Sequence, residues 1–247
     1  MRVILLLFFL LTSASADDKK YSIADIKELV ADKHYEEALV HLREDFKPTE
    51  RTADWKDLAG QAAAGFASAG KDDVEKLINM MRVEEAIPSV VKHARYAEVR
   101  TALAPKGFAG CYERSYDVGE CNTYAQKFID ADPSNGKLAL AVAKAARKGQ
   151  NAYGAVPLFK RAVAATKTAC KDKDLELSVI AALGLPTDHD LFADGHALAA
   201  DRCWPELRPA ILKKLGGASG YYKDNACGML RAKGEKAEFD RRCANED

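Results

Sequence analysis

This chain of 247 residues contains six cysteines, whose reactivity and spacing make them the first candidates for a chemical role. A thiolate can act as a nucleophile or bind zinc, and two thiols can form a disulfide. No two of these cysteines have the separation of roughly two to four residues that is typical of structural zinc sites. Their even number favours disulfides, which persist in oxidising compartments. The six are Cys111, Cys121, Cys170, Cys203, Cys227 and Cys243.

The last four cysteines flank two turns symmetrically. In an antiparallel helical hairpin, residues at equal distances from the turn face each other. One pair is centred on Glu235, and the other is centred on a Gly-Leu-Pro-Thr turn. The two remaining cysteines would close a short loop, although spacing alone leaves the other pairings open. The expected disulfides are Cys111–Cys121, Cys170–Cys203 and Cys227–Cys243.

Two histidines with neighbouring aspartates are the other candidates for chemistry. His189 and His196 are seven residues apart, and Asp190 follows the first. On a helix this spacing separates the imidazoles by about 10–11 Å along the axis, which is too far for both to bind one ion without a bend. A metal site at His189, His196 and Asp190 would need such a bend, and it is one hypothesis. The favoured interpretation is a capping aspartate beside solvated or packed histidines.

Tyr221 and Tyr222 are the candidate recognition residues. They follow a glycine-rich turn, and exposed aromatic side chains are enriched at interfaces. No nucleophile elbow, phosphate-binding loop or dinucleotide fingerprint is present in the sequence. Adjacent pairs of acidic residues are explained by solvated helix faces and first-turn charges. We therefore predict no catalytic residue and no cofactor.

The hydrophobic pattern of the sequence predicts that the elements carrying these residues are helices. Ser22 and Asp25 resemble an N-cap with an acidic third position at the start of the first helix. Between Trp55 and Ala67, apolar side chains recur at helical spacing over about three turns. Alanine is abundant, and no segment has a convincing strand pattern. The chain is expected to be all-α and built from antiparallel helical hairpins.

The stretch from Pro105 to Gly119 is the least regular part of the sequence and contains three glycines. We expect a helix to end at Pro105, because the residue before a proline is biased away from helix. The stretch is therefore interpreted as a long loop or a seam between subdomains. It separates cysteine-free hairpins in residues 17–104 from disulfide-stapled hairpins in residues 105–247, which we expect to continue the same array.

Residues 1–16 have the pattern of a secretory signal peptide. Arg2 precedes an apolar run from Val3 to Leu11, and Ala14-Ser15-Ala16 is a small-residue cleavage site. The apolar run is too short to cross a bilayer, which needs about 20 residues. We expect a secreted or periplasmic mature protein that begins at Asp17 and has no transmembrane segment.

The charge of the chain bears on the class of its partner. It contains 37 basic and 37 acidic residues, with both signs interspersed along the sequence. It therefore lacks the basic field that attracts nucleic acid or anionic lipid. The expected partner is a protein or peptide, and nucleic acid is not expected.

Several segments share a pattern of small and large residues around a helical turn. A small residue at the turn precedes an alanine, a large residue and another small residue. The small residues let two helices approach, and the large residue fills the groove against the next pair. Segments with parts of this pattern are Tyr35, Ala38 and Leu42; Gly149, Ala155, Phe159 and Ala162; and Gly119, Phe128 and Ala131.

This pattern resembles the tetratricopeptide (TPR) repeat and the related Sel1-like repeat, whose helical hairpins stack into an α-solenoid. The spacing from Ala131 to Ala162 is 31 residues, whereas the usual TPR period is about 34. The resemblance implies a groove of stacked helices that binds a protein or peptide. The expected function is an exported helical-repeat scaffold in the cell envelope or extracellular space. The alternative is a secreted helical enzyme that acts on a cell-envelope polymer.

Overall fold

The computed structural model describes residues 20–114, 118–149 and 154–243, so the expected signal peptide at residues 1–16 lies outside the described part. The described residues form thirteen α-helices and no strand, which confirms the all-α prediction. Within them, no helix is both long and apolar enough to span a membrane. In chain order the helices are α1 (Ile23–Ala31), α2 (Tyr35–Glu44), α3 (Ala53–Ser68), α4 (Asp73–Ala86), α5 (Ala94–Arg114), α6 (Val118–Asp130), α7 (Gly136–Gly149), α8 (Val156–Ala165), α9 (Lys173–Ala182), α10 (Asp190–Ala197), α11 (Trp204–Leu215), α12 (Gly220–Ala232) and α13 (Lys236–Arg242).

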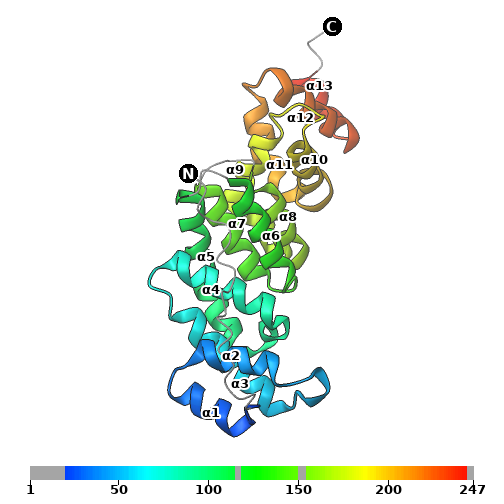
Figure 1. Ribbon diagram of the computed structural model, residues 1–247. Coiled ribbons are helices and arrows are strands. Elements are labelled where there is room, and N and C mark those ends of the chain that lie inside the picture. Colours follow the sequence, from blue (N-terminus) through cyan, green and yellow to red (C-terminus); the bar gives the residue numbers. More distant parts are fainter. Residues whose placement is uncertain (1–19, 115–117, 150–153, 244–247) are drawn as a thin grey trace.

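The helices form an elongated array, with α1 at one end and α13 at the other (Figure 1). Each odd-numbered helix from α1 to α9 packs against the helix that follows it and against the next odd-numbered helix. α11 packs against α12, and α12 packs against α13. Stacked helical hairpins have this pattern, because each pair mainly contacts its neighbours.

The first helices begin and pack as the sequence predicts. The Ser22 hydroxyl accepts a bond from the Asp25 backbone N–H at 3.3 Å, and the Asp25 carboxylate accepts from the Ser22 N–H at 2.8 Å. This reciprocal capping box begins α1. In α3, the buried Trp55 donates from Nε1 to the Leu42 carbonyl at 2.9 Å. The polar end of the largest side chain of α3 is thereby paired with α2.

The prediction that a helix ends at Pro105 is wrong. Pro105 lies inside α5, which continues to Arg114. Ala104 directly precedes the proline, and Phe108 and Tyr112 follow it at helical spacing. All three side chains are buried. An interior proline costs a helix about 3 kcal/mol, and burial of this apolar face outweighs that cost. The helix therefore crosses residue 105, which the sequence suggested as a seam.

Gly107, in this stretch, has a packing role that could not be recognised from the sequence pattern. A Cβ atom on Gly107 would lie 2.5 Å from Leu77 Cβ and 2.7 Å from the Asp73 carbonyl oxygen. No larger residue fits without a shift of α4, so glycine sets the close approach of α4 and α5. Gly107, which suggested a loop, instead marks a tight contact between two helices.

The three expected disulfides are all present. One bridge spans the hairpin of α9 and α10, and another joins α12 to the residue that follows α13. Their Cα–Cα separations fall within the range of about 4.4–6.8 Å that a disulfide permits. The separations are 6.1 Å for Cys111–Cys121, 5.2 Å for Cys170–Cys203 and 5.9 Å for Cys227–Cys243.

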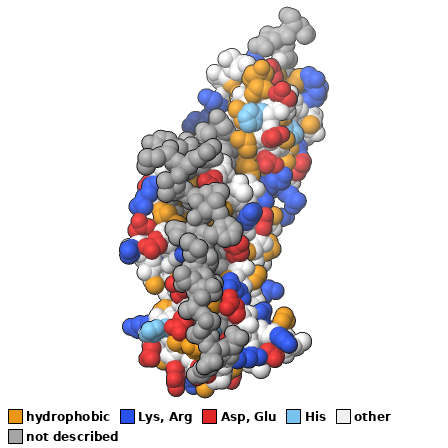
Figure 2. Space-filling model, in the orientation of Figure 1, with side chains coloured by type: hydrophobic (Ala, Val, Ile, Leu, Met, Phe, Trp, Pro, Cys, Tyr) orange, Lys and Arg blue, Asp and Glu red, His pale blue; other side chains and the backbone are white. Residues whose placement is uncertain are grey.

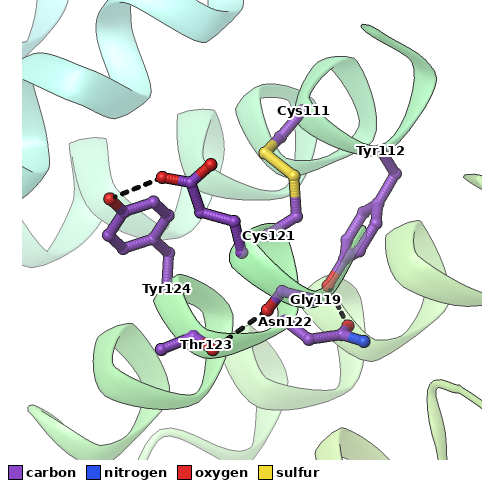
Figure 3. The surroundings of a disulfide bond; sticks show 8 residues. Cys111, Tyr112, Gly119, Cys121, Asn122, Thr123 and Tyr124 are labelled. Carbon is purple, nitrogen blue, oxygen red and sulfur yellow. Dashed lines mark hydrogen bonds between the residues drawn. A yellow bond between two sulfur atoms is a disulfide. The ribbon is translucent and has the colours of Figure 1, made fainter. Parts of the chain in front are cut away.

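The first disulfide differs from the expected loop closure, because Cys111 lies in the last turns of α5 and Cys121 in the first turns of α6 (Figure 3). Next to the bridge, the Tyr112 hydroxyl donates to Asn122 Oδ1 at 2.7 Å. The bridge and this hydrogen bond both connect α5 to α6, so they fix the angle at which the second helix leaves the first.

A buried ion pair joins α4, α5 and α6. Arg100 of α5 is fully buried and donates from Nε to Glu84 Oε1 at 2.7 Å and from Nη2 to Glu84 Oε2 at 3.1 Å. Arg100 also donates to the Phe128 carbonyl, and the Tyr96 hydroxyl donates to Glu84 at 2.9 Å. Burial raises the pKa of Glu84, and the hydrogen bond from Arg100 opposes that rise. This network ties successive hairpins together.

Candidate binding groove

A hollow of about 410 Å³ opens between α1, α3 and α5 at one end of the array. These helices are consecutive members of the odd-numbered row, since α1 packs against α3 and α3 against α5. The hollow therefore lies on the surface that this row presents. Its lining residues are Ile23, Lys27, Val30, Ala31, Tyr35, Asp54, Asp57, Leu58, Gln61 and Arg95.

The apolar part of the groove is built by α1 and α3. Ile23 and Val30 of α1 are half-buried, and Leu58 of α3 is almost completely buried. Tyr35, at the start of α2, packs over Gly65 of α3, where an added Cβ would lie 2.4 Å from the Tyr35 ring. The small residue at position 65 thus holds the tyrosine ring against α3, beside the hollow.

One carboxylate of the groove is held by two hydrogen bonds. Asp57 Oδ2 accepts from Gln61 Nε2 at 2.7 Å, and Asp57 Oδ1 lies 3.2 Å from His93 Nε2. The His93 ring occupies the space over Gly60, where an added Cβ would lie 2.0 Å from the ring. Asp57 nevertheless has 61% of its side chain exposed. It is an oriented, solvent-accessible acceptor.

Three further charges line the groove. Lys27, Asp54 and Arg95 are all exposed, and none of them forms an ion pair with another residue of the described ranges. They come from α1, α3 and α5 respectively, so charges of both signs surround the apolar surface. Such an arrangement can orient a polar ligand whose own charges are complementary.

Charges of both signs also cover the surface more widely. The face in Figure 2 has acidic and basic side chains interspersed along the visible part of the array. This agrees with the equal totals of acidic and basic residues in the sequence. On this face, no single sign dominates the length of the molecule.

The predicted metal residues do not come together as a site. His189 precedes α10 as its N-cap, and its Nδ1 accepts from the Leu191 N–H at 3.2 Å. His196 packs its ring against Phe192 at a centroid distance of 5.6 Å. Asp190 is the first residue of α10. In the described ranges, no group of three or more His, Cys, Asp or Glu side chains could hold a metal ion.

The two predicted recognition tyrosines have different environments. Tyr221 is 56% exposed, whereas Tyr222 is buried. The Tyr222 hydroxyl donates to the Ile211 carbonyl at 3.4 Å, and burial raises the pKa of Tyr222. Tyr222 therefore packs α12 against α11, and only Tyr221 could contact a ligand. Both lie on α12, at the opposite end of the array from the groove (Figure 1).

The sequence does not predict the groove, although α3 carries a signal for part of its lining. Asp54, Asp57, Leu58 and Gln61 have the spacing of one helical face. Because Leu58 also belongs to the apolar stripe of this helix, Asp54, Asp57 and Gln61 look in the sequence like an ordinary solvated face. Their role depends on α1 and α5, which flank that face only after the hairpins stack.

Comparison with known proteins leaves the chain without an assigned family. No protein-family model matches it, and neither curated proteins nor solved structures give a match. The packed helices are nevertheless compatible with a helical-repeat fold.

Proposed function

We propose that this protein is an exported, TPR-like helical scaffold that binds a peptide or an extended protein segment in the groove of α1, α3 and α5. The observation that carries the proposal is a set of charged side chains, without an ion-pair partner among the described residues, around an apolar surface. Lys27, Asp54 and Arg95 surround Ile23 and the other apolar lining residues. Apolar contacts would supply binding energy, and the charges would select sequence and direction.

The three disulfides support export. Disulfides form and persist outside the cytosol, and each cysteine in the chain takes part in one. Residues 1–16 have the pattern of a cleaved signal peptide. Secretion or a periplasmic location would provide the oxidising conditions that these bridges need.

A binding role fits the groove better than the alternative role as an enzyme on a cell-envelope polymer. Asp57 is exposed and already accepts hydrogen bonds from Gln61 and His93. Glycosidase acids work as a pair in which one carboxyl is shielded enough to hold a proton near neutral pH. The carboxylates of this groove lack that shielding, which favours recognition over catalysis.

A charge-reversal experiment tests the proposal. Peptides are selected from a phage-displayed random library on the immobilised, oxidised protein, and affinities of synthetic copies are measured by fluorescence anisotropy. The double variant Lys27→Glu, Arg95→Glu should weaken the selected peptides by about tenfold or more, because two complementary contacts become repulsive.

The matched control reverses the charge of two exposed lysines, one on α3 and one on α5, that do not line the groove. Lys56→Glu, Lys106→Glu makes the same change in net charge. Affinity should stay within about twofold of the unmodified protein. Equal weakening by both double variants, or a library that yields no binder, would overturn the proposal. Release of sugars from a cell-envelope polymer by the unmodified protein would favour the enzyme instead.

A further inference from the structure

The charges that line the groove have an order, because each of its three helices contributes a single sign. α3 packs against both α1 and α5, so it lies between them in the row. α1 contributes Lys27 and α5 contributes Arg95, whereas α3 contributes Asp54 and Asp57. The order of charge across the groove is therefore positive, negative and positive.

The two acids of α3 form one negative centre in the middle of the groove. Asp54 and Asp57 are three residues apart, which places them on one face of the helix, and both are exposed. The hydrogen bond from Gln61 and the contact with His93 hold Asp57 in place. Among the described residues, neither acid forms an ion pair with the cations of α1 and α5. Both carboxylates can therefore accept a basic group of a ligand.

The two cations that flank this centre are accessible. Lys27 and Arg95 are exposed, and neither forms an ion pair within the described ranges. Glu28 and Glu98 are exposed acids on the same two helices, but they do not line the hollow. Lys56, the exposed base of α3, is also outside the lining. The charges that a ligand in the groove would meet are those of the four lining residues.

The distance between neighbouring helices bears on the conformation of the ligand. Packed helices lie about 8–10 Å apart, which sets the step from one sign of charge to the next. A polyproline II segment has three residues per turn and rises about 3.1 Å per residue, so every third residue returns to one face after about 9 Å. A β-strand returns to one face every second residue, after roughly 7 Å. The repeat of polyproline II matches the step between helices better.

The uncharged lining of the groove suits the apolar residues of such a segment. Polyproline II segments dock in grooves that are lined by aromatic side chains. Tyr35 lines the hollow, and the contact of its ring with Gly65 holds it against α3. Ile23 and Val30 of α1 add aliphatic surface to the same hollow. Proline rings between the charged residues of a ligand would cover this surface.

We propose that the groove selects an extended, proline-rich segment in which an acid, a base and a second acid follow one another at every third residue. This inference rests on the proposed function and specifies its ligand. The base would pair with Asp54 and Asp57, and the two acids would pair with Lys27 and Arg95. A preformed polyproline II segment loses little conformational freedom on binding, which favours it over a flexible segment of the same charge order.

Fluorescence anisotropy with three labelled peptides, capped at both ends, tests the proposal on the oxidised protein. Asp-Pro-Pro-Lys-Pro-Pro-Asp has the proposed order, and Asp-Pro-Pro-Asp-Pro-Pro-Lys has the same composition in another order. The first should bind about fivefold more tightly or better, because the second brings like charges together at two helices. Asp-Gly-Gly-Lys-Gly-Gly-Asp keeps the charge order in a flexible chain and should bind more weakly than the first peptide.

A charge-swapped variant tests the role of the central acids. Asp54→Lys should narrow the preference between the two proline peptides to about twofold or less, since it places a base on α3 and leaves Asp57 with its partners. Glu85→Lys makes the same charge change at an exposed residue of α4 outside the groove, and it should keep the preference. Equal narrowing by both variants would mean a diffuse electrostatic effect and would refute the charge order. Circular dichroism checks that each variant keeps its helices.

The outcomes separate this inference from the proposed function. Equal affinity for the two proline peptides, with both weakened by Lys27→Glu, Arg95→Glu, would reject the charge order and leave peptide binding in the groove intact. Equal affinity for the proline and glycine peptides would reject the polyproline II conformation. Binding of library peptides without binding of any of the three designed peptides would overturn the inference as a whole. If library peptides do not bind either, the proposed function itself is wrong.

Discussion

Arg100 of α5 donates from Nε and Nη2 to the two carboxylate oxygens of Glu84 in α4, at 2.7 and 3.1 Å, inside the helical array. The same guanidinium lies over the Phe128 ring of α6, with its Cζ atom 3.8 Å from the ring centroid. Loss of one member of a buried pair leaves the other charge without compensation. Three helices therefore depend on one ion pair.

Replacement of Glu84 by Gln should destabilise the protein by about 1–3 kcal/mol at low pH, because an amide N–H₂ group would face the Arg100 Nη2 donor that Glu84 Oε2 now accepts. The effect should depend on pH. Burial raises the pKa of Glu84 above its ordinary value of 4.5, so the folded protein holds this proton more tightly than the unfolded chain does. The contribution of Glu84 to stability is complete below that ordinary pKa and declines as pH rises through the folded-state pKa.

Urea denaturation at a series of pH values measures this effect. The difference in free energy of unfolding between the unmodified protein and Glu84→Gln should narrow as pH rises from about 4.5. Glu85→Gln is the control, since Glu85 is the exposed neighbour on the same helix. A difference that widens with pH, or one that Glu85→Gln reproduces, would contradict the assignment.

Gly107 should tolerate no side chain. Gly107→Ala places a Cβ 2.5 Å from Leu77 Cβ and should cost about 1–3 kcal/mol, because α4 and α5 must move apart. Gly228→Ala is the matched control within a helix, since an added Cβ there has no atom within 4 Å. That control should be neutral or stabilising by about 0.5–1 kcal/mol. Thermal unfolding of both variants separates the outcomes, and similar midpoints would refute the close contact.

The sequence predicts the hairpins and the disulfides well because both depend on local spacing. The pairing Cys227–Cys243 follows from the distance of each cysteine to the turn at Glu235, and the structure confirms it. The continuation of α5 through Pro105 could not be predicted in this way. It depends on the burial of Phe108 and Tyr112 by neighbouring helices, which a local rule for proline does not include.

The candidate sites were harder to predict than the fold. Tyr222 follows Tyr221 in the sequence, but the helix turns the two side chains to different surroundings, and only Tyr221 is exposed. Lys27, Asp54 and Arg95 are far apart in the chain and become neighbours of one hollow through stacking of α1, α3 and α5. Tertiary packing creates such a site, so no short sequence motif predicts it.

Export should remove the first sixteen residues. The intact mass of the exported protein should correspond to a chain that begins at Asp17 and has three disulfides. Ala14→Arg, Ala16→Arg should block cleavage, because signal peptidase sites require small residues at these positions. Ser15→Ala is the control and should be processed normally. An exported protein that retains Met1 would contradict the signal-peptide assignment.

The most direct test of the central claim is to locate a bound peptide by photo-crosslinking. A benzoylphenylalanine at Gln61 would lie in the groove, whereas one at Lys56 would lie on the same helix outside the groove lining. With a peptide selected on the unmodified protein, the account predicts a cross-link from position 61 and none from position 56, as read by mass spectrometry. Cross-linking from position 56 alone, or equally from both positions, would contradict a binding groove formed by α1, α3 and α5.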